Sequence, residues 1–263
     1  MVLPVEIKNN MHELIREGMS INCISKTLGL WKSTIYYHYK SIKGRKILKP
    51  KFTIAGGEVE GEIIGAFASD GSACPQADYH ISFYFGKDEI EYAQDFAGIL
   101  HYYFNKRPYF YQKPEKSVIV VSYRSKDIYH KFIKHYLEWR EGEKKTYSVK
   151  LRELPLSKQF LVGFLRGCLD CDGYAKGRVV QFGGVSKAML LQIKKIVEDL
   201  QFNLRFYTTK DKRPNCADMH YVKIAGDDTK RFLELIKPRN KKRMGLPGLS
   251  HCVRSTVASG VSI

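Results

Sequence analysis

Long hydrophobic runs are missing from this sequence. No apolar stretch in its 263 residues reaches the roughly 20 residues that a membrane-spanning helix requires, so we do not expect a membrane protein. The first 20 residues carry Glu6, Lys8, Glu13, Arg16 and Glu17, and charges there disfavour a secretory signal peptide. We therefore expect an intracellular location, in the cytoplasm or nucleoid of a prokaryote or in an organelle.

Cysteine is scarce, and several catalytic motifs do not occur. Six cysteines scattered through the chain favour reduced thiols over a disulfide framework. Cys168 and Cys171 form one C-x2-C pair, but the candidates downstream, Cys216 and His220, do not form the second tight pair of a zinc site. The phosphate loop G-x4-G-K-[ST], the zinc motif H-E-x-x-H and the hydrolase motif G-x-S-x-G are all absent from the sequence.

Acidic residues are also in short supply relative to basic ones. The chain has 44 Lys and Arg against 27 Asp and Glu, a formal net charge of +17. Such an excess indicates a polyanionic partner, with nucleic acid as the first candidate. The length is sufficient for one large domain or two ordinary ones.

The amino-terminal segment has the pattern of three short helices. Apolar residues recur at helical spacing over Val5–Glu17, and Gly18 ends that helix. Ser20 is placed to cap a second helix, Gly29 breaks the chain, and a third helix is expected over about 32–41. The order resembles helix-turn-helix DNA-binding domains, and a structural three-helix cap is the alternative. In the DNA-binding interpretation, the side chains that face a groove are Ser33, Thr34, Tyr36, Tyr37 and His38.

One pattern occurs twice in the rest of the chain. Gly61–Gly71 and Gly163–Gly173 both read G-x3-G-x4-D-G, and Asp70 and Asp172 are 172 − 70 = 102 residues apart, a domain-sized repeat. Two glycines four residues apart leave one helix face bare, so two such helices can pack backbone to backbone. Each Asp then falls in a last helical turn, and we expect the following Gly to be left-handed.

The two carboxylates are expected to meet where these helices end. Carboxylate oxygens are the hard ligands that Mg²⁺ prefers. A metal site of this kind can stabilise the attacking and leaving oxygens of a phosphodiester displacement. Either motif alone would favour helix packing or a turn, but their recurrence in register favours catalysis.

The segments that follow each motif also match in order. The first half predicts a strand over 79–85, a helix over 87–105, strands over 109–112 and 118–123, and a helix over 127–139. The second predicts a strand over 178–182, a helix over 186–200, strands over 204–209 and 219–224, and a helix over 227–236. An early strand near 73–77 and near 174–177 completes two α-β-β-α-β-β-α repeats. The predicted fold class is therefore α+β with paired antiparallel sheets.

The two motifs resemble those of single-chain LAGLIDADG homing endonucleases, in the segments Ile63–Gly71 and Leu165–Gly173. The resemblance covers about residues 52–245. It implies that Asp70 and Asp172 bind the metal and that the backbone carbonyls of Ser69 and Cys171 are additional ligands. The first motif has Ala68 where the family commonly has an acidic residue, whereas the second keeps Asp170. That position is structural in the family, so cleavage is still expected.

The resemblance further implies a monomer whose two sheets form a saddle over double-stranded DNA with a long, asymmetric target site. Alternation of polar and apolar residues in the predicted strands gives each sheet one polar face that can read base edges. The residues predicted for these faces are His80, Ser82, Tyr84, Arg205, Tyr207, Thr209, Tyr221 and Lys223. A basic residue near the metal would assist the chemistry, and Lys87 and Lys176 are the candidates.

Five parts are expected along the chain. They are a helix-turn-helix module over 1–45, a basic linker over 46–57, a first repeat over 58–150, a second repeat over 151–245 and a mobile tail over 246–263. The basic run around the linker, which can contact phosphates, comprises Lys40, Lys43, Arg45, Lys46, Lys49 and Lys51.

The predicted function is metal-dependent cleavage of double-stranded DNA. One alternative is a DNA-binding regulator that has lost cleavage, although it would have no chemical reason to hold two carboxylates together. The other is a maturase that binds its host intron RNA, which the charge alone does not distinguish from a DNA-binding protein.

Overall fold

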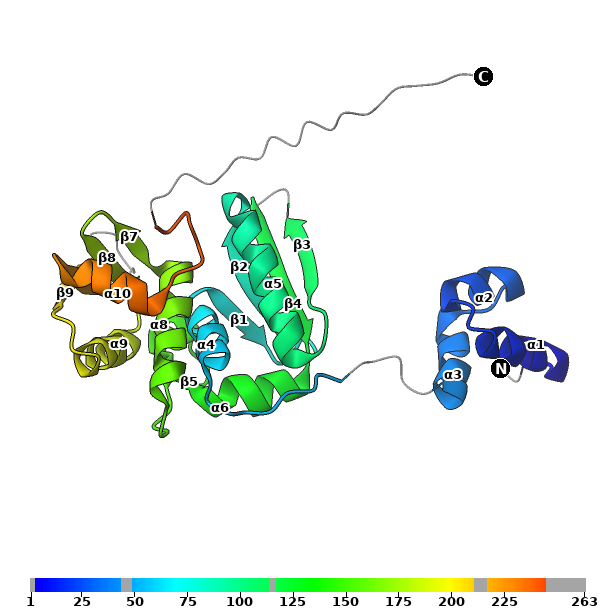
Figure 1. The fold of residues 1–263 in the computed structure, drawn as a ribbon. Helices are drawn as coiled ribbons and strands as arrows, with labels where there is room; N and C mark the ends of the chain where they lie inside the picture. The colour runs from blue at the N-terminus through cyan, green and yellow to red at the C-terminus, as the bar shows by residue number, and fades with distance from the viewer. Residues whose placement is uncertain (1–2, 44–48, 114–116, 211–216, 245–263) are drawn as a thin grey trace, which may run out of the picture. The chain divides into compact units, whose positions relative to one another are not determined.

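The computed structural model describes residues 3–43, 49–113, 117–210 and 217–244 (Figure 1). Arg45 and Lys46 of the basic run, Cys216 and the predicted tail over 246–263 lie outside the described residues. The chain forms two compact units, residues 1–49 and 50–263, and each is described by itself.

The described residues of the first unit form three helices, α1 (Val5–Arg16), α2 (Ile21–Leu28) and α3 (Lys32–Lys43). Ser20 caps α2, because its hydroxyl accepts a hydrogen bond from the Cys23 amide at 3.2 Å. Gly29 ends α2 in the left-handed conformation, with φ of 63°. The fully buried side chains that join the three helices are Met11, Ile15, Ile24 and Ile35.

The first half of the second unit begins with α4 (Glu58–Asp70) and continues through β1 (Gly71–Cys74), β2 (His80–Gly86) and α5 (Ile90–Phe104), with one short turn of 3-10 helix, η1 (Lys87–Glu89), before α5. The strands β3 (Tyr109–Lys113) and β4 (Val118–Arg124) complete an antiparallel sheet of order β1-β2-β4-β3. Phe83 and Phe85 pack on Phe96 of α5, which covers the inner face of this sheet.

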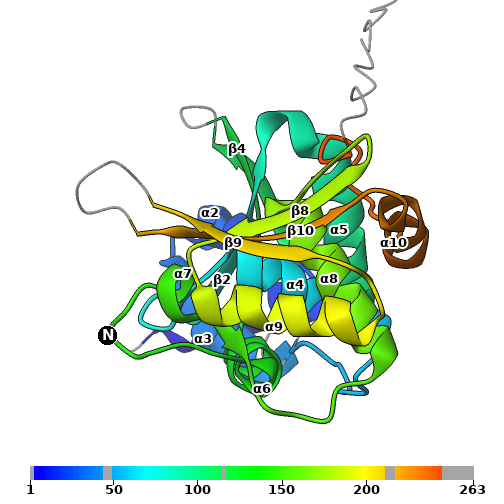
Figure 2. The ribbon, with the colours of Figure 1, turned by 90° about the vertical axis from the view of Figure 1, so that its left-hand side faces the viewer.

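The second half repeats this arrangement. It consists of α8 (Lys158–Asp172), β7 (Tyr174–Lys176), β8 (Val179–Gly184), α9 (Lys187–Asp199), β9 (Arg205–Thr209), β10 (Met219–Ala225) and α10 (Asp228–Ile236). Its sheet has the corresponding order β7-β8-β10-β9. Figure 2 shows α9 running alongside the strands of this sheet. The predicted α+β fold with two antiparallel sheets is confirmed.

The helices α4 and α8 lie side by side between the two sheets (Figure 1). Their backbones touch at the paired glycines, as the motif spacing predicts. A Cβ atom built at Gly61 would lie 2.0 Å from the Phe160 carbonyl oxygen, and one at Gly163 would lie 1.9 Å from that of Glu58. No side chain fits at those distances, so glycine is required on both helices.

The glycine after each Asp has a different role from the one predicted. Gly71 and Gly173 both have φ of −82°, which is not left-handed, so that prediction is wrong. Glycine is needed at these two positions because the backbone one turn earlier leaves no room for a side chain. A Cβ atom would lie 2.4 Å from the Phe67 carbonyl oxygen at Gly71 and 2.5 Å from that of Leu169 at Gly173.

The segment between the two halves also differs from prediction. A single helix over 127–139 was expected, but the chain forms a π-helix, η3 (Ile128–Ile133), followed by one turn of helix, α6 (Lys134–Tyr136). The short strands β5 (Leu137–Glu138) and β6 (Lys150–Leu151) then pair around the single turn α7 (Lys145–Ser148), and none of these three elements was predicted.

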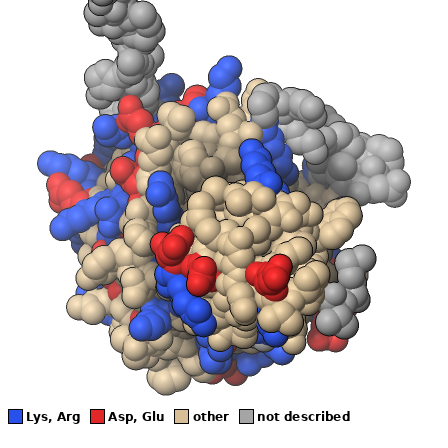
Figure 3. Space-filling model, turned by 90° about the vertical axis from the view of Figure 1, so that its right-hand side faces the viewer, with Lys and Arg blue, Asp and Glu red and all other residues tan. Residues whose placement is uncertain are grey.

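The surface reflects the excess of basic residues. Figure 3 shows Lys and Arg side chains spread over one face, with fewer acidic side chains among them. Within the four described ranges, none of the helices has the length and apolarity needed to cross a membrane.

Candidate active site

Asp70 and Asp172 come together at the ends of α4 and α8. The two carboxyl groups share a hydrogen bond, although they are far apart in sequence. Asp70 is half-buried, whereas Asp172 keeps more of its surface in solvent. Burial among protein atoms and the neighbouring Asp172 carboxylate raise the pKa of Asp70 to about 7. Without a cation, the pair therefore tends to hold one proton near neutral pH.

Lys145 lies directly beside this pair. Its ammonium group donates hydrogen bonds to the last carbonyl oxygens of α4, those of Phe67 at 2.5 Å, Ala68 at 2.7 Å and Ser69 at 3.3 Å. A cation at a helix carboxyl end is electrostatically favourable. Burial lowers the pKa of Lys145 to about 8, although the two Asp carboxylates oppose that shift.

A second cation, Arg243, acts on the same two carboxylates. Its Nε atom lies 3.2 Å from a carboxylate oxygen of Glu89. Lys145 follows Asp70 by 145 − 70 = 75 residues, and Arg243 follows Asp172 by 243 − 172 = 71 residues. Each repeat thus supplies one carboxylate and, from a segment near its carboxyl end, one cation.

These are not the basic residues predicted from sequence. Lys87 is an exposed residue at the start of η1. Lys176 is exposed in β7, paired with Val179. No signal in the sequence pointed to Lys145, because it lies in a segment for which no element was predicted.

The chain after α10 crosses back over the end of α8, and we refer to residues 237–244 as the strap. Asp170 accepts hydrogen bonds from the strap amides of Arg239 and Asn240, each at 3.0 Å. The buried Asn240 side chain donates to the Asp170 carbonyl oxygen at 2.8 Å and to Glu89 at 3.0 Å. Asp170 therefore has a structural role. Ala68, its counterpart in the first motif, has no carboxylate. The ammonium group of Lys145 binds the carbonyl oxygen of Ala68 instead.

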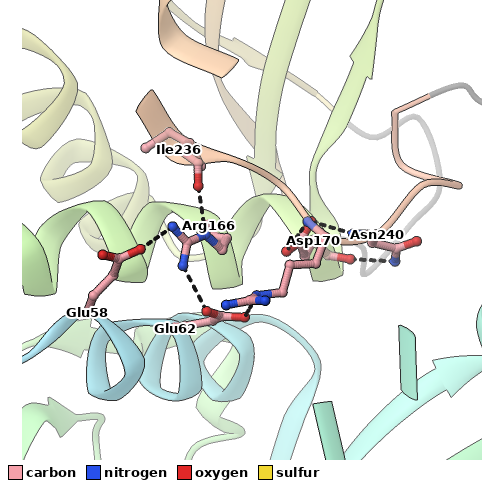
Figure 4. A network of polar contacts seen from close by, with 7 residues as sticks. Glu58, Glu62, Arg166, Asp170, Ile236 and Asn240 are labelled. Atoms are coloured by element: carbon pink, nitrogen blue, oxygen red, sulfur yellow. Dashed lines mark hydrogen bonds and ion pairs between the residues drawn. The ribbon is translucent and has the colours of Figure 1, made fainter. Parts of the chain in front are cut away.

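A buried ionic network joins the strap to both motif helices (Figure 4). The guanidinium of Arg166 in α8 binds Glu58, Glu62 at 3.0 Å and the carbonyl oxygen of Ile236 at 2.6 Å. Arg239 of the strap lies 2.8 Å from the same Glu62. The network fixes the two helices relative to one another, since removal of one partner would leave a buried charge uncompensated.

Each sheet has one outer face that carries the predicted recognition residues. Strand pairing places His80, Ser82 and Tyr84 on one face of β2. Pairing in the second sheet joins Tyr221 to Tyr207 and Lys223 to Arg205, on the face that also carries Thr209. Ser82 is only 2% exposed, so its hydroxyl contributes little to this surface. Two residues of the second outer face were missed by sequence reasoning, Tyr174 and Gln181.

Comparison with known proteins gives one family match and several structural ones. Residues 159–237 match the LAGLIDADG-like domain. No curated protein matches the sequence. The structure of I-DmoI in complex with DNA and Mn aligns with a TM-score of 0.51 and 13% identity, covering 69% of this chain and 97% of that one.

The fold is that of the LAGLIDADG homing endonucleases. Mesophilic variants of the homing endonuclease I-DmoI align over 69% of this chain and 96% of theirs, with a TM-score of 0.50 and 13% identity. Full-length DUF199/WhiA from Thermatoga maritima aligns with 14% identity and a TM-score of 0.49 over 73% of this chain. The chain spans 60% of the length of that protein.

Within this LAGLIDADG fold, the donors at the helix ends fit a hard divalent cation. Asp70 and Asp172 supply carboxylate oxygens, and the carbonyls of Ser69 and Cys171 belong to the same two helix ends. Lys145 competes for the Ser69 carbonyl only through its longest hydrogen bond, at 3.3 Å. The described part of the chain has no group of three or more His, Cys, Asp or Glu side chains suited to a metal. Water and phosphate oxygens would have to complete the coordination, as is usual for Mg²⁺.

The predicted recognition residues of α3 are divided between its two faces. Ser33 and Tyr37 are exposed, whereas Thr34 and Tyr36 are half-buried. His38 is also half-buried, and its Nδ1 atom lies 3.0 Å from the Nε2 atom of His12 in α1, so its ring is engaged within the unit.

Proposed function

We propose that this protein is a site-specific endonuclease, a homing endonuclease, that hydrolyses one phosphodiester in each strand of double-stranded DNA. The observation that carries the proposal is the meeting of Asp70 and Asp172, one from each repeat, with Lys145 and Arg243 beside them. Such a pair of carboxylates is costly to hold together unless a cation neutralises it.

The role of each residue follows from its position. Asp70, Asp172 and the carbonyls of Ser69 and Cys171 would hold Mg²⁺ or another divalent cation, which supplies Lewis acidity toward the phosphate. Lys145 keeps the carbonyls of α4 in place, and its charge offsets the paired carboxylates. Arg243 is placed to stabilise charge that develops on a phosphate oxygen.

The partner that fits the surface is a long, asymmetric stretch of duplex DNA. The outer faces of the two sheets form the proposed saddle, and they carry different residues, so the two halves of the target should differ. Ser33, Thr34, Tyr36 and Tyr37 of α3 offer a second contact from the amino-terminal unit. Both carboxylates belong to one chain, so a monomer suffices for activity.

The test is cleavage of a plasmid that carries the flanking DNA of the gene, rejoined as an uninterrupted sequence. We expect double-strand cutting with Mg²⁺ and none with a chelator. The matched control is a plasmid in which the same flanking sequence is scrambled. Tight binding of the rejoined sequence without cutting under any divalent cation would refute the endonuclease proposal. It would favour a regulator, or a maturase if intron RNA binds more tightly.

A further inference from the structure

The outer face of the second sheet carries a row of hydrogen-bond donors. Strand pairing aligns Tyr174 of β7, Gln181 of β8, Lys223 of β10 and Arg205 of β9 across all four strands. Lys and Arg side chains can only donate hydrogen bonds. Arg205 is exposed and Lys223 is half-buried, so both reach the surface.

The adjacent row fixes the amide of Gln181. The rings of Tyr207 and Tyr221 stack, with their centroids 5.0 Å apart and an interplanar angle of 21°. The Tyr221 ring also packs against Gly183. A Cβ atom at Gly183 would lie 3.0 Å from the Tyr221 ring, so the missing side chain makes room for it. The Tyr207 hydroxyl then donates to the Gln181 Oε1 atom at 2.9 Å. Since this bond engages the amide oxygen, Gln181 offers its N–H groups to a partner.

The two central rows of the corresponding face of the first sheet contain no charged residue of their own. One row joins Ser72, Ser82, Ser122 and Tyr109, and the next joins Tyr84, Val120 and Tyr111. The charged residues of this face start from the ends of the described strands, where His80 pairs with Arg124 and Lys113 pairs with Val118. From there the Lys113 ammonium group reaches to 5.9 Å from the centroid of the Tyr84 ring. Burial, with Arg124 and Lys113 nearby, lowers the pKa of His80 and so favours its neutral form.

We propose that the second sheet recognises a guanine-rich half-site, with Gln181, Lys223 and Arg205 as its specificity-determining residues. Guanine presents two acceptors, N7 and O6, in the major groove, and therefore matches a row of donors. Adenine is normally bound by both the oxygen and the nitrogen of a Gln amide, but Tyr207 occupies one of the two acceptor sites of that oxygen and so favours the donor role of Gln181. The central rows of the first sheet carry no Lys, Arg or Gln, so its half-site has no such requirement. This inference rests on duplex DNA being the partner in the proposed function.

The experiment is selection of bound sequences from a random duplex library by the full chain in a chelating buffer, where cleavage has no part. We expect guanine to be enriched on one strand of one half-site. Arg205→Gln and Lys223→Gln should each reduce that preference about 10-fold at one position and leave the other half-site unchanged. Tyr207→Phe frees the Gln181 oxygen, so it should shift one position from guanine toward adenine.

The matched control is Lys230→Gln, which removes one positive charge from the exposed surface of α10. It should leave the selected sequence unchanged, and melting curves verify that every variant, including the Arg205→Gln/Lys223→Gln double variant, is folded. A selected site without guanine asymmetry, or one whose asymmetry survives in the Arg205→Gln/Lys223→Gln double variant, would overturn this inference alone. Selection of no sequence at all would overturn it together with the proposed site-specific function.

Discussion

The ammonium group of Lys145 lies 2.7 Å from the carbonyl oxygen of Ala68, at the motif position where the second repeat has Asp170. The two repeats stabilise their helix ends by different means. In the first, a side-chain cation binds the helix carbonyls. In the second, Asp170 binds the strap amides. The asymmetry places Lys145 beside the paired carboxylates and gives it a role that can be tested.

Replacement of Lys145 by Met should reduce the single-turnover cleavage rate by roughly 100-fold, because a cation that offsets the paired carboxylates is lost. DNA affinity should change little, since Lys145 lies at the helix ends and not on the outer faces of the sheets. The matched control is Lys144→Met, which removes the exposed neighbouring charge. Equal cleavage rates for the Lys145 variant and the control would exclude this role.

The raised pKa of Asp70 predicts an unusual pH dependence of stability in the metal-free protein. A carboxyl whose pKa is near 7 in the folded state and 3.8 in the unfolded state binds more protons when folded. The free energy of unfolding should therefore fall as pH rises from about 4 to 7. Asp70→Asn should remove this loss and be more stable than wild type at pH 8 by about 1–2 kcal/mol.

Urea unfolding between pH 4 and 8, with chelator present, measures this effect. Asp199→Asn, at an exposed site in α9, is the control and should keep the wild-type slope. A wild-type stability that rises steadily across this range would contradict the prediction. Addition of Mg²⁺ should reduce the pH dependence, because the cation displaces the shared proton.

Gly163→Ala should destabilise the second unit by about 3 kcal/mol or more, because the added Cβ would overlap the Glu58 carbonyl oxygen and force α4 and α8 apart. Gly98→Ala is the matched control within a helix. Nothing lies within 4 Å of a Cβ at Gly98, so that substitution should be neutral or stabilising by about 0.5–1 kcal/mol. Urea midpoints of the two variants give the comparison. Similar destabilisation by both would contradict the proposed close packing.

Asn240→Ala should destabilise the protein by about 2 kcal/mol, because Glu89 and the Asp170 carbonyl lose their buried partner. Lys241→Ala, at the exposed next position of the strap, should cost less than about 0.5 kcal/mol. Thermal melting of the two variants beside wild type measures the difference. If Asn240→Ala melts with wild type, the side-chain hydrogen bonds of Asn240 contribute nothing to the stability of the fold.

Much of the fold could be predicted because local patterns repeat. The paired glycines of α4 and α8 predicted the helix contact, and alternation along β2, β9 and β10 predicted which side chains share an outer face. The same spacing placed Asp70 and Asp172 at the ends of touching helices, although it misjudged the conformation of Gly71 and Gly173.

The cations at the site could not be predicted, because tertiary structure alone brings them there. Lys145 and Arg243 lie 75 and 71 residues beyond their Asp partners, in segments without hydrophobic periodicity. Gln181 was missed for a related reason. Its strand was predicted, but its place between Tyr174 and Lys223 depends on the pairing of three strands.

The most direct test of the central claim compares wild type with Asp70→Asn and Asp172→Asn on a target duplex labelled at the end of each strand. The account predicts that either substitution abolishes Mg²⁺-dependent cleavage of both strands and leaves DNA affinity intact or increased, because a negative charge near phosphate is removed. Cutting at the wild-type rate by the Asp70→Asn/Asp172→Asn double variant would contradict it and move the chemistry to another part of the protein.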